Sequence, residues 1–443
     1  MKLKNCLLAL YSLMKKFLIK YFSTKIIRKA FFSAFLISNF IFVSIFDLAI
    51  LNFISPFLAI YGFYTLLKFN KYEFFTTGFF VGILWFYWIS FSLAYYGFGY
   101  LIPLEILFIG IVYGFMFFIA AIPPQIWLRA ILLILISNLH PFNFNWLNFE
   151  AIFVVGIFKP NLYGFVFIFA AILSLFYIKT KLKFLAFITL LLFAVQYNDT
   201  KAKILPFEVA LANTNVPQAL KWEKSLKNEF INQNLKMIDE AINEGKRIII
   251  MPESVFPTFM THERNLVAEL KEKSQKIAIV VGALAYENGQ SYNSTFLFDK
   301  GEMKRFDKFV LVPFGEEIPL PNLMKNLINE LFFDGSKDFK KANSVSDYEI
   351  DGVKIRNAIC YEATRYELFK GEFDVMIAIT NNGWFVPSTE PNLQRLLIKY
   401  YATKYNKTIY HSVNGSKSEI ITPKESLIKK IFRSDLLKFL ARS

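Results

Sequence analysis

Cys360 is one of two cysteines in the chain, and its place at the end of a predicted strand makes it a candidate nucleophile. It closes the apolar run VKIRNAIC, and a helix is predicted to begin near Glu362. Helix N–H groups at such a strand-to-helix turn lower the pKa of a thiol and expose it, which favours the reactive thiolate. A buried, unreactive strand cysteine is the competing interpretation.

A thiol nucleophile needs a base, which is often a histidine, but this chain has few histidines. The three histidines, His140, His262 and His411, stand at no metal-ligand spacing. Glu253 is the better candidate, because it follows the apolar run RIIIM and Pro252 takes the chain out of the sheet. Open α/β sheets place their ligands at such strand ends.

Lys308 is a candidate for stabilising negative charge. It precedes an apolar run in DKFVLVPFGEEIP, where Pro313, Gly315 and Glu316 mark a tight loop. A buried lysine beside carboxylates would hold a positive charge for an oxyanion. For an isolated lysine, a solvated surface cation is the simpler interpretation.

Motifs for other chemistries are missing from the sequence. There is no Walker A motif, and Gly97-Phe98-Gly99 is too short and in the wrong context for a dinucleotide loop. We therefore expect neither a cofactor nor a metal.

The elements that position these residues fall into two halves of different composition. The chain has 443 residues, of which 55% are hydrophobic and 52 are Phe, and its net charge is +15. Of its 50 bases and 35 acids, 15 bases but only four acids precede residue 197, so most of the basic excess belongs to the apolar half. Nucleic-acid binders instead carry a basic patch on a polar domain, so nucleic acid is excluded as a partner.

The first half is predicted to cross a membrane several times, since about 20 apolar residues span a bilayer. The seven candidate spans are 30–46, 48–69, 74–95, 101–122, 124–138, 161–178 and 182–197. Eight Lys and Arg residues lie in 1–29, whereas alternate loops are nearly bare of them. The positive-inside rule then places the N-terminus and Cys6 in the cytoplasm and everything after Gln196 outside, so Cys6 and Cys360 cannot form an intramolecular disulfide.

Two features of this half stand apart from the spans. The segment 139–160 is apolar but irregular and rich in Asn, so we expect a re-entrant or interfacial piece. Glu105 lies inside a predicted span, where an acid is either functional or simply hydrated near the outer interface.

From about residue 204 the pattern changes to an α/β domain, in which short apolar strands alternate with amphipathic helices. The predicted strands are 205–213, 247–251, 277–283, 292–299, 353–360, 373–380 and 407–413. The predicted helices are 219–244, 262–275, 322–333, 362–370 and 390–405. The tail 425–443 has the spacing of a basic amphipathic helix, either on the membrane surface or at the domain edge.

Taken together, these segments resemble the apolipoprotein N-acyltransferase family, in which a nitrilase-like domain follows a multispan membrane domain. The resemblance rests on NTNVPQALKW (213–222), MPESVFP (251–257), YNSTFLFD (292–299), DKFVLVPFGEEIP (307–319), ICYE (359–362) and NNGWF (381–385). It implies an αββα sandwich over 198–424, after a membrane domain over 1–197 and before the tail.

The resemblance also implies roles for individual residues. Glu253 becomes the general base, Lys308 the oxyanion-stabilising cation and Cys360 the nucleophile. The supporting positions are Glu316, Tyr361, Glu362, Trp222 and Trp384. The sequence departs from the family's pattern at YATKYNK (401–407) and HSVNGS (411–416), and the tail stands in place of a final span.

The implied activity is acyl transfer from a phospholipid to the α-amino group of a diacylated apolipoprotein, with ping-pong kinetics and a Cys360 thioester. The implied location is the bacterial inner membrane, with the catalytic domain of a monomer on the periplasmic side. Two alternatives stay open: a membrane-tethered nitrilase-type amidase, and a non-catalytic transport or lipid-binding protein.

Overall fold

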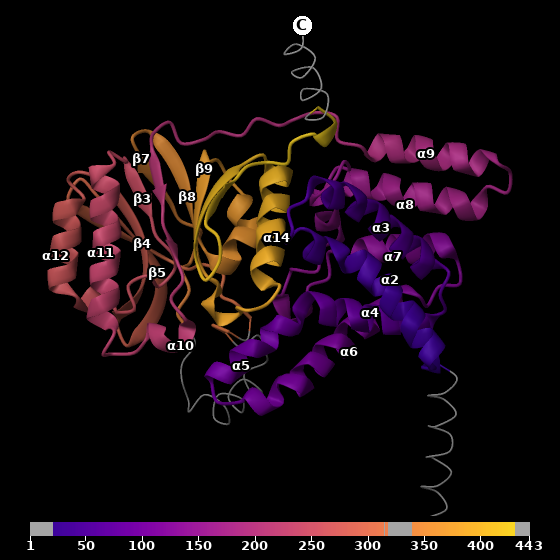
Figure 1. Cartoon of the computed structure of the whole chain (residues 1–443), viewed down its shortest axis with the longest axis horizontal. Coiled ribbons are helices and arrows are strands. Elements are labelled where there is room, and N and C mark those ends of the chain that lie inside the picture. The colour runs from indigo at the N-terminus through magenta and orange to yellow at the C-terminus, as the bar shows by residue number, and fades with distance from the viewer. Residues whose placement is uncertain (1–20, 314, 318–338, 430–443) are drawn as a thin grey trace, which may run out of the picture. The chain divides into compact units, whose positions relative to one another are not determined.

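The computed structural model describes residues 21–313, 315–317 and 339–429, which form two compact units (Figure 1). The first unit holds the described parts of 1–141, 147–199 and 425–443. The second holds 142–146 and 200–424, so a short piece from the middle of the apolar half belongs to the α/β unit.

Helices build the first unit. The α-helices are α2 (Thr24–Val43), α3 (Ala49–Leu67), α4 (Lys71–Phe86), α5 (Ser92–Tyr95), α6 (Ile102–Ala120), α7 (Ile126–Ile136), α8 (Leu162–Tyr177) and α9 (Leu182–Ala194). The 3₁₀ helices are η1 (Tyr87–Phe91), η2 (Gly99–Leu101), η3 (Pro141–Asn143) and η4 (Phe149–Val154). The last two lie in the segment 139–160, which is irregular, as its composition predicts.

Five stretches of the described chain are long and apolar enough to cross a membrane. They are Thr24–Val43, Ala49–Leu67, Lys71–Tyr95, Gly99–Ala120 and Ile126–Asn143. The other two predicted spans correspond to α8 and α9, which have only 16 and 13 residues. The count of seven spans therefore stays a prediction.

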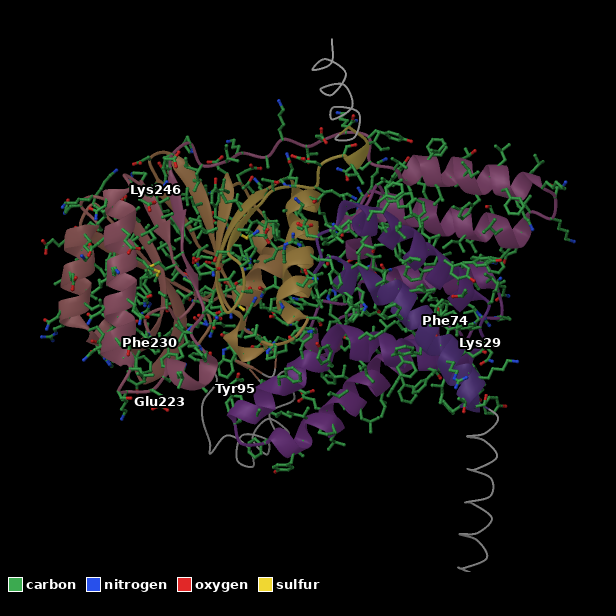
Figure 2. The ribbon with its side chains drawn as sticks, viewed as in Figure 1. Lys29, Phe74, Tyr95, Glu223, Phe230 and Lys246 are labelled. Atoms are coloured by element: carbon green, nitrogen blue, oxygen red, sulfur yellow. The ribbon has the colours of Figure 1, made fainter. Side chains whose placement is uncertain are left out.

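Small residues allow the helices of this unit to pack closely. A Cβ atom at Gly78 of α4 would lie 2.6 Å from the Phe117 side chain of α6, and one at Gly82 would lie 2.8 Å from Tyr113. Small residues let helix backbones approach where no water drives association. Phe74 is fully buried nearby on α4, whereas Lys29 is exposed (Figure 2).

Two mixed sheets form the second unit. The first has the order β1 (Val209–Leu211), β3 (Ile248–Ile250), β4 (Ala278–Glu287), β5 (Gln290–Asp299), β6 (Glu302–Asp307). The second has the order β11 (Glu419–Ile421), β10 (Thr408–Asn414), β9 (Val375–Asn381), β8 (Val353–Ile359), β7 (Asp347–Ile350), with β2 (Asn213–Thr214) beside β10. Three strands of each sheet run parallel to one another. In the first sheet these are β1, β3 and β4, and in the second they are β8, β9 and β10.

Strand alternation decides what each sheet face packs against. Ile248 and Ile250 join one core with Ile377 and Ile379 of the other sheet, whereas Ile249 joins a second core with α11 (Lys227–Asn243) and α12 (Arg264–Lys273). Helix α14 (Glu390–Tyr405) packs on β10 and β11 of the second sheet (Figure 1). The result is the predicted αββα sandwich.

All seven predicted strands are present, but some helices differ from the prediction. The predicted helix 219–244 is divided into α10 (Gln218–Lys221) and α11. The predicted helix 362–370 is wrong: it forms two 3₁₀ turns, η6 (Cys360–Thr364) and η7 (Tyr366–Phe369), because Arg365 is extended between them. The helix 322–333 and the tail beyond residue 429 lie outside the described residues.

Candidate active site

The three predicted catalytic residues follow strands that end at one edge of the sandwich. Glu253 comes three residues after β3, Lys308 directly follows β6 and Cys360 directly follows β8. Since β6 is antiparallel to β5, and β5 to β4, strand β6 runs in the same direction as β3 and β4. Strand β8, which carries Cys360, belongs to the other sheet, which packs against the first. The structure brings together Glu253, Lys308 and Cys360, which are 55 and 52 positions apart in sequence.

Unusual backbone conformations present Glu253 and Cys360 to the site. Cys360 has φ +54° and Ser254, next to the base, has φ +49°. A left-handed conformation costs a non-glycine residue about 1–2 kcal/mol, so the surrounding fold must hold it in place. Gly282 of β4 makes room for the base, because a Cβ atom there would lie 2.6 Å from the Cα of Glu253.

Lys308 is a buried cation between two carboxylates. Its Nζ lies 2.7 Å from Oε2 of Glu316 and 3.8 Å from Oε1 of Glu253, and the side chain is 1% exposed. Burial alone lowers the pKa of Lys308, but the nearby carboxylates of Glu316 and Glu253 oppose this, and the net effect is a pKa above the ordinary value. The lysine therefore stays positively charged in the site.

Glu253 is held at both carboxylate oxygens. Asn293 Nδ2 donates to Oε1 at 2.7 Å, and the backbone N–H of Asn381 donates to Oε2 at 2.9 Å. The same Asn293 Nδ2 donates to Glu316 at 2.8 Å, so one amide links both acids of the lysine cluster. These bonds fix the orientation of the carboxylate that would take a proton from the thiol.

The predicted lowering of the Cys360 pKa is wrong. Burial, followed by the negative charge of Glu253, raises the pKa of the thiol well above its usual value, and Lys308 opposes this only in part. The turn after Cys360 is a 3₁₀ helix of five residues, not the longer α-helix expected. The thiol is therefore protonated at rest and needs a base when it reacts.

Glu362 connects the lysine loop to the strand that carries the nucleophile. Its Oε1 accepts from the N–H groups of Phe309 and Val310 at 2.7 and 2.9 Å, and its Oε2 accepts from that of Ile359 at 2.8 Å. Burial raises the pKa of Glu362 to about 7, against the opposing effects of Lys308 and the three N–H groups. By binding these three N–H groups, Glu362 holds the segment after Lys308 against the end of β8, next to the candidate nucleophile.

Tyr361 points to the segment 142–146. Its hydroxyl accepts from the N–H of Asn145 and donates to the carbonyl of Asn143, both at 3.2 Å. The Phe144 ring stacks on it with a centroid distance of 5.7 Å, and Trp146 donates to Thr364 at 2.8 Å. The residue after the nucleophile is thus an anchor for this segment.

The two predicted tryptophans lie at the ends of two short helical segments. Trp222 ends α10 and is 43% exposed. Trp384 closes the turn η8 (Asn382–Trp384), directly after the strand whose last residue, Asn381, binds Glu253.

Three site residues are absent from the sequence-based predictions: Asn293, Glu390 and Gln394. Asn293 lies within the segment YNSTFLFD, but the neighbouring Ser294 and Thr295 are polar too, so its polarity did not single it out. Glu390 and Gln394 lie on α14, and nothing in their spacing distinguishes them from other helical residues.

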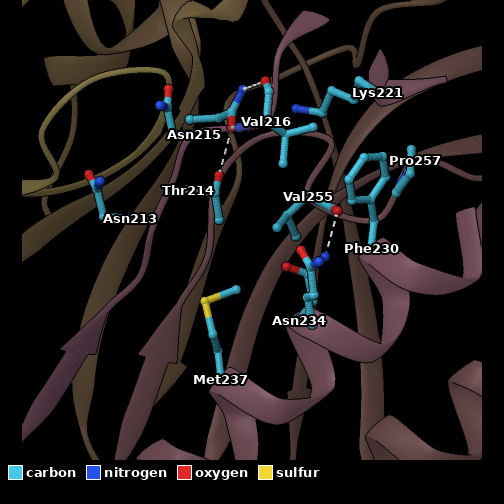
Figure 3. A pocket seen from close by; sticks show the side chains of 12 residues that line it. Asn213, Thr214, Asn215, Val216, Lys221, Phe230, Asn234, Met237, Val255 and Pro257 are labelled. Atoms are coloured by element: carbon cyan, nitrogen blue, oxygen red, sulfur yellow. Dashed lines mark hydrogen bonds between the residues drawn. The ribbon is translucent and has the colours of Figure 1, made fainter. Parts of the chain in front are cut away.

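A pocket of about 280 Å³ lies beside the base rather than at the nucleophile (Figure 3). None of Glu253, Lys308 and Cys360 lines it; its wall includes Lys221, Phe230 and Asn234. The Lys221 Nζ donates to the carbonyl of Glu253 at 3.2 Å, and burial lowers the pKa of Lys221 to about 8. Lys221 therefore supports the backbone of the base from the pocket side.

Comparisons with known proteins show which family the chain resembles. The family model described as the apolipoprotein N-acyltransferase integral membrane domain matches residues 23–197. An apolipoprotein N-acyltransferase of Wolinella succinogenes is 42% identical over 91% of this chain and 97% of its own length. One of Campylobacter jejuni is 39% identical over 91% of each chain. The resemblance expected from the sequence motifs is confirmed.

Solved structures similar to the chain match about half of it. A carbon–nitrogen hydrolase superfamily protein of Xanthomonas campestris has a TM-score of 0.37 and 13% identity, over 48% of this chain and 77% of its own. An amidase of Nesterenkonia sp. has a TM-score of 0.36 and 13% identity, over 50% and 85%.

Proposed function

Because the chain belongs to the apolipoprotein N-acyltransferase family, we propose that it transfers an acyl chain from a membrane phospholipid to the α-amino group of a diacylglyceryl-cysteine. That cysteine is the N-terminal residue of an apolipoprotein. The observation that carries the proposal is the buried Lys308 between Glu253 and Glu316, at the strand edge where Cys360 stands.

The first half-reaction forms a thioester. Glu253 takes the Cys360 proton, and the sulfur attacks an ester carbonyl carbon of the phospholipid. Lys308 and the backbone N–H after the nucleophile stabilise the oxyanion. The carbon–oxygen bond then breaks, and the lysophospholipid oxygen takes the proton from Glu253.

The second half-reaction transfers the acyl group to nitrogen. The acceptor amine attacks the thioester carbonyl, Glu253 removes an N–H proton, and the carbon–sulfur bond breaks. The proton returns to the Cys360 sulfur. Because the lysophospholipid leaves before the acceptor reacts, the kinetics are ping-pong.

The membrane half keeps both substrates in the lipid phase. Extracting an acyl chain into water costs about 0.8 kcal/mol per CH₂, so an enzyme acting on two- and three-chain lipids has to work at the bilayer. The excess of Lys and Arg in residues 1–29 supports a cytoplasmic N-terminus and a catalytic domain on the periplasmic side of the inner membrane.

The test uses the full chain in detergent micelles with a phosphatidylethanolamine and a synthetic diacylated lipopeptide. We expect the lipopeptide to gain the mass of one acyl chain, and no gain with Cys360→Ala. A wild-type protein that leaves the lipopeptide unchanged but hydrolyses small amides would overturn the proposal in favour of an amidase.

A further inference from the structure

One face of α14 lies against the nucleophile. Gln394 is 1% exposed, and its Nε2 lies 3.8 Å from the Cys360 sulfur. Glu390 stands four residues earlier, so it lies one turn away on the same helix face, and it is also 1% exposed. Glu390 is close enough to Cys360 and Glu253 to be coupled electrostatically to both.

Both side chains carry a buried acceptor oxygen without a donor in the described part of the chain. These atoms are Oε2 of Glu390 and Oε1 of Gln394. The Gln394 oxygen shares a carbon with the nitrogen that contacts Cys360, so it too is near the sulfur. An unsatisfied buried polar atom costs about 1–3 kcal/mol, and native proteins keep few of them.

Two acceptors without donors beside the nucleophile suit a ligand that brings N–H or O–H groups. The phospholipid ester has only oxygen acceptors at its reacting carbon, and the oxyanion needs donors, which Lys308 supplies. The acceptor's amine is the reactant that carries N–H groups to the thioester. We propose that Glu390 and Gln394 bind the α-amino group of the acceptor and hold its nitrogen against the thioester carbonyl.

This inference rests on the proposed function and gives its second half-reaction a binding site. Burial, followed by the charge of Glu253, raises the pKa of Glu390 well above its usual value and so favours the uncharged carboxyl. An uncharged carboxyl accepts from a neutral amine, which keeps the lone pair needed for attack. The new carbon–nitrogen bond forms as the carbon–sulfur bond breaks, and Glu253 moves the displaced proton from nitrogen to sulfur.

The experiment measures the two half-reactions separately. The full chain is first incubated with phosphatidylethanolamine, and thioester formation is followed by intact mass. The isolated acyl-enzyme then receives either the diacylated lipopeptide or hydroxylamine, a small nucleophile that does not need a binding site. The variants are Glu390→Met, which has no acceptor oxygen, Glu390→Gln, which retains one, and the exposed control Glu349→Gln on β7.

We expect Glu390→Met to slow transfer to the lipopeptide at least tenfold more than it slows thioester formation, the effect of one lost hydrogen bond. Its thioester should react with hydroxylamine as the wild-type thioester does. Glu390→Gln should transfer within about threefold of wild type, because its amide oxygen still accepts.

Three results would overturn the inference: equal slowing of both half-reactions by Glu390→Met, equal slowing of lipopeptide and hydroxylamine, or a Glu390→Gln variant as slow as Glu390→Met. Failure of the proposed function is distinguishable from all three, because the wild-type protein would then form no thioester or transfer none of it.

Discussion

Glu316→Gln tests whether the charge on Lys308 depends on its ion pair. Glu316 accepts from the Lys308 Nζ at 2.7 Å, from Asn293 at 2.8 Å and from the Val312 N–H at 2.9 Å. The substitution removes the charge and keeps the shape. Among the described residues, the carboxylate that remains paired with Lys308 is that of Glu253, at 3.8 Å.

The magnitude follows from this geometry. Two charges about 3 Å apart attract by about 5 kcal/mol at an effective dielectric constant of about 20, and breaking a buried pair costs about 3–5 kcal/mol in measured cases. We therefore expect the free energy of unfolding to fall by about 3 kcal/mol. Thioester formation should slow by about 10²–10³-fold, the effect of losing one oxyanion donor.

The neighbouring residue is a matched control. Glu317 pairs with Lys341 at 3.9 Å, and the Lys341 side chain is 60% exposed. Because exposed ion pairs contribute about 0–1 kcal/mol, Glu317→Gln should change neither quantity by more than about 0.5 kcal/mol. The assays are thermal unfolding in detergent and the initial rate of thioester formation by intact mass. Equal behaviour of the two variants would refute the reasoning.

Two further predictions concern the residues around the triad. Tyr361→Phe removes the hydroxyl bonds to Asn143 and Asn145 and should lower unfolding stability by about 1–3 kcal/mol, measured as a lower Tm; an unchanged Tm would mean that this anchor is not formed. Lys221 has a folded pKa of about 8, below the value near 10.4 of an unfolded lysine, so the unfolded state binds more protons between these pH values. Wild-type stability should therefore rise by about 2–3 kcal/mol from pH 8 to pH 10.5 relative to Lys221→Met, and parallel Tm–pH curves for the two proteins would contradict this.

Local patterns in the sequence are sufficient to predict seven of the strands. The apolar runs before Glu253 and Cys360 form β3 and β8, which belong to different sheets, so it is the packing of the two sheets that brings the two residues together. The strands β6, β7 and β11 were not predicted, because short or edge strands with charged residues lack the apolar signal.

Sequence patterns could not predict the pKa values of the groups in the site. The pKa of Cys360 is raised rather than lowered, since burial and the carboxylates around it come from segments far apart in the chain. Glu390 at the first position of α14 would be ordinary on an exposed helix, where an acid favours the N-terminus. Only the tertiary packing shows that its carboxyl is buried near the thiol.

The central claim is that Cys360 carries the acyl group, and intact mass measurement of the full chain with phospholipid alone tests it most directly. We predict a gain of one acyl chain, located at Cys360 by peptide mapping, removed by hydroxylamine and absent from Cys360→Ala and Glu253→Gln. A protein that acylates lipopeptide while its own mass stays unchanged, or that carries the acyl group on another residue, would contradict the account.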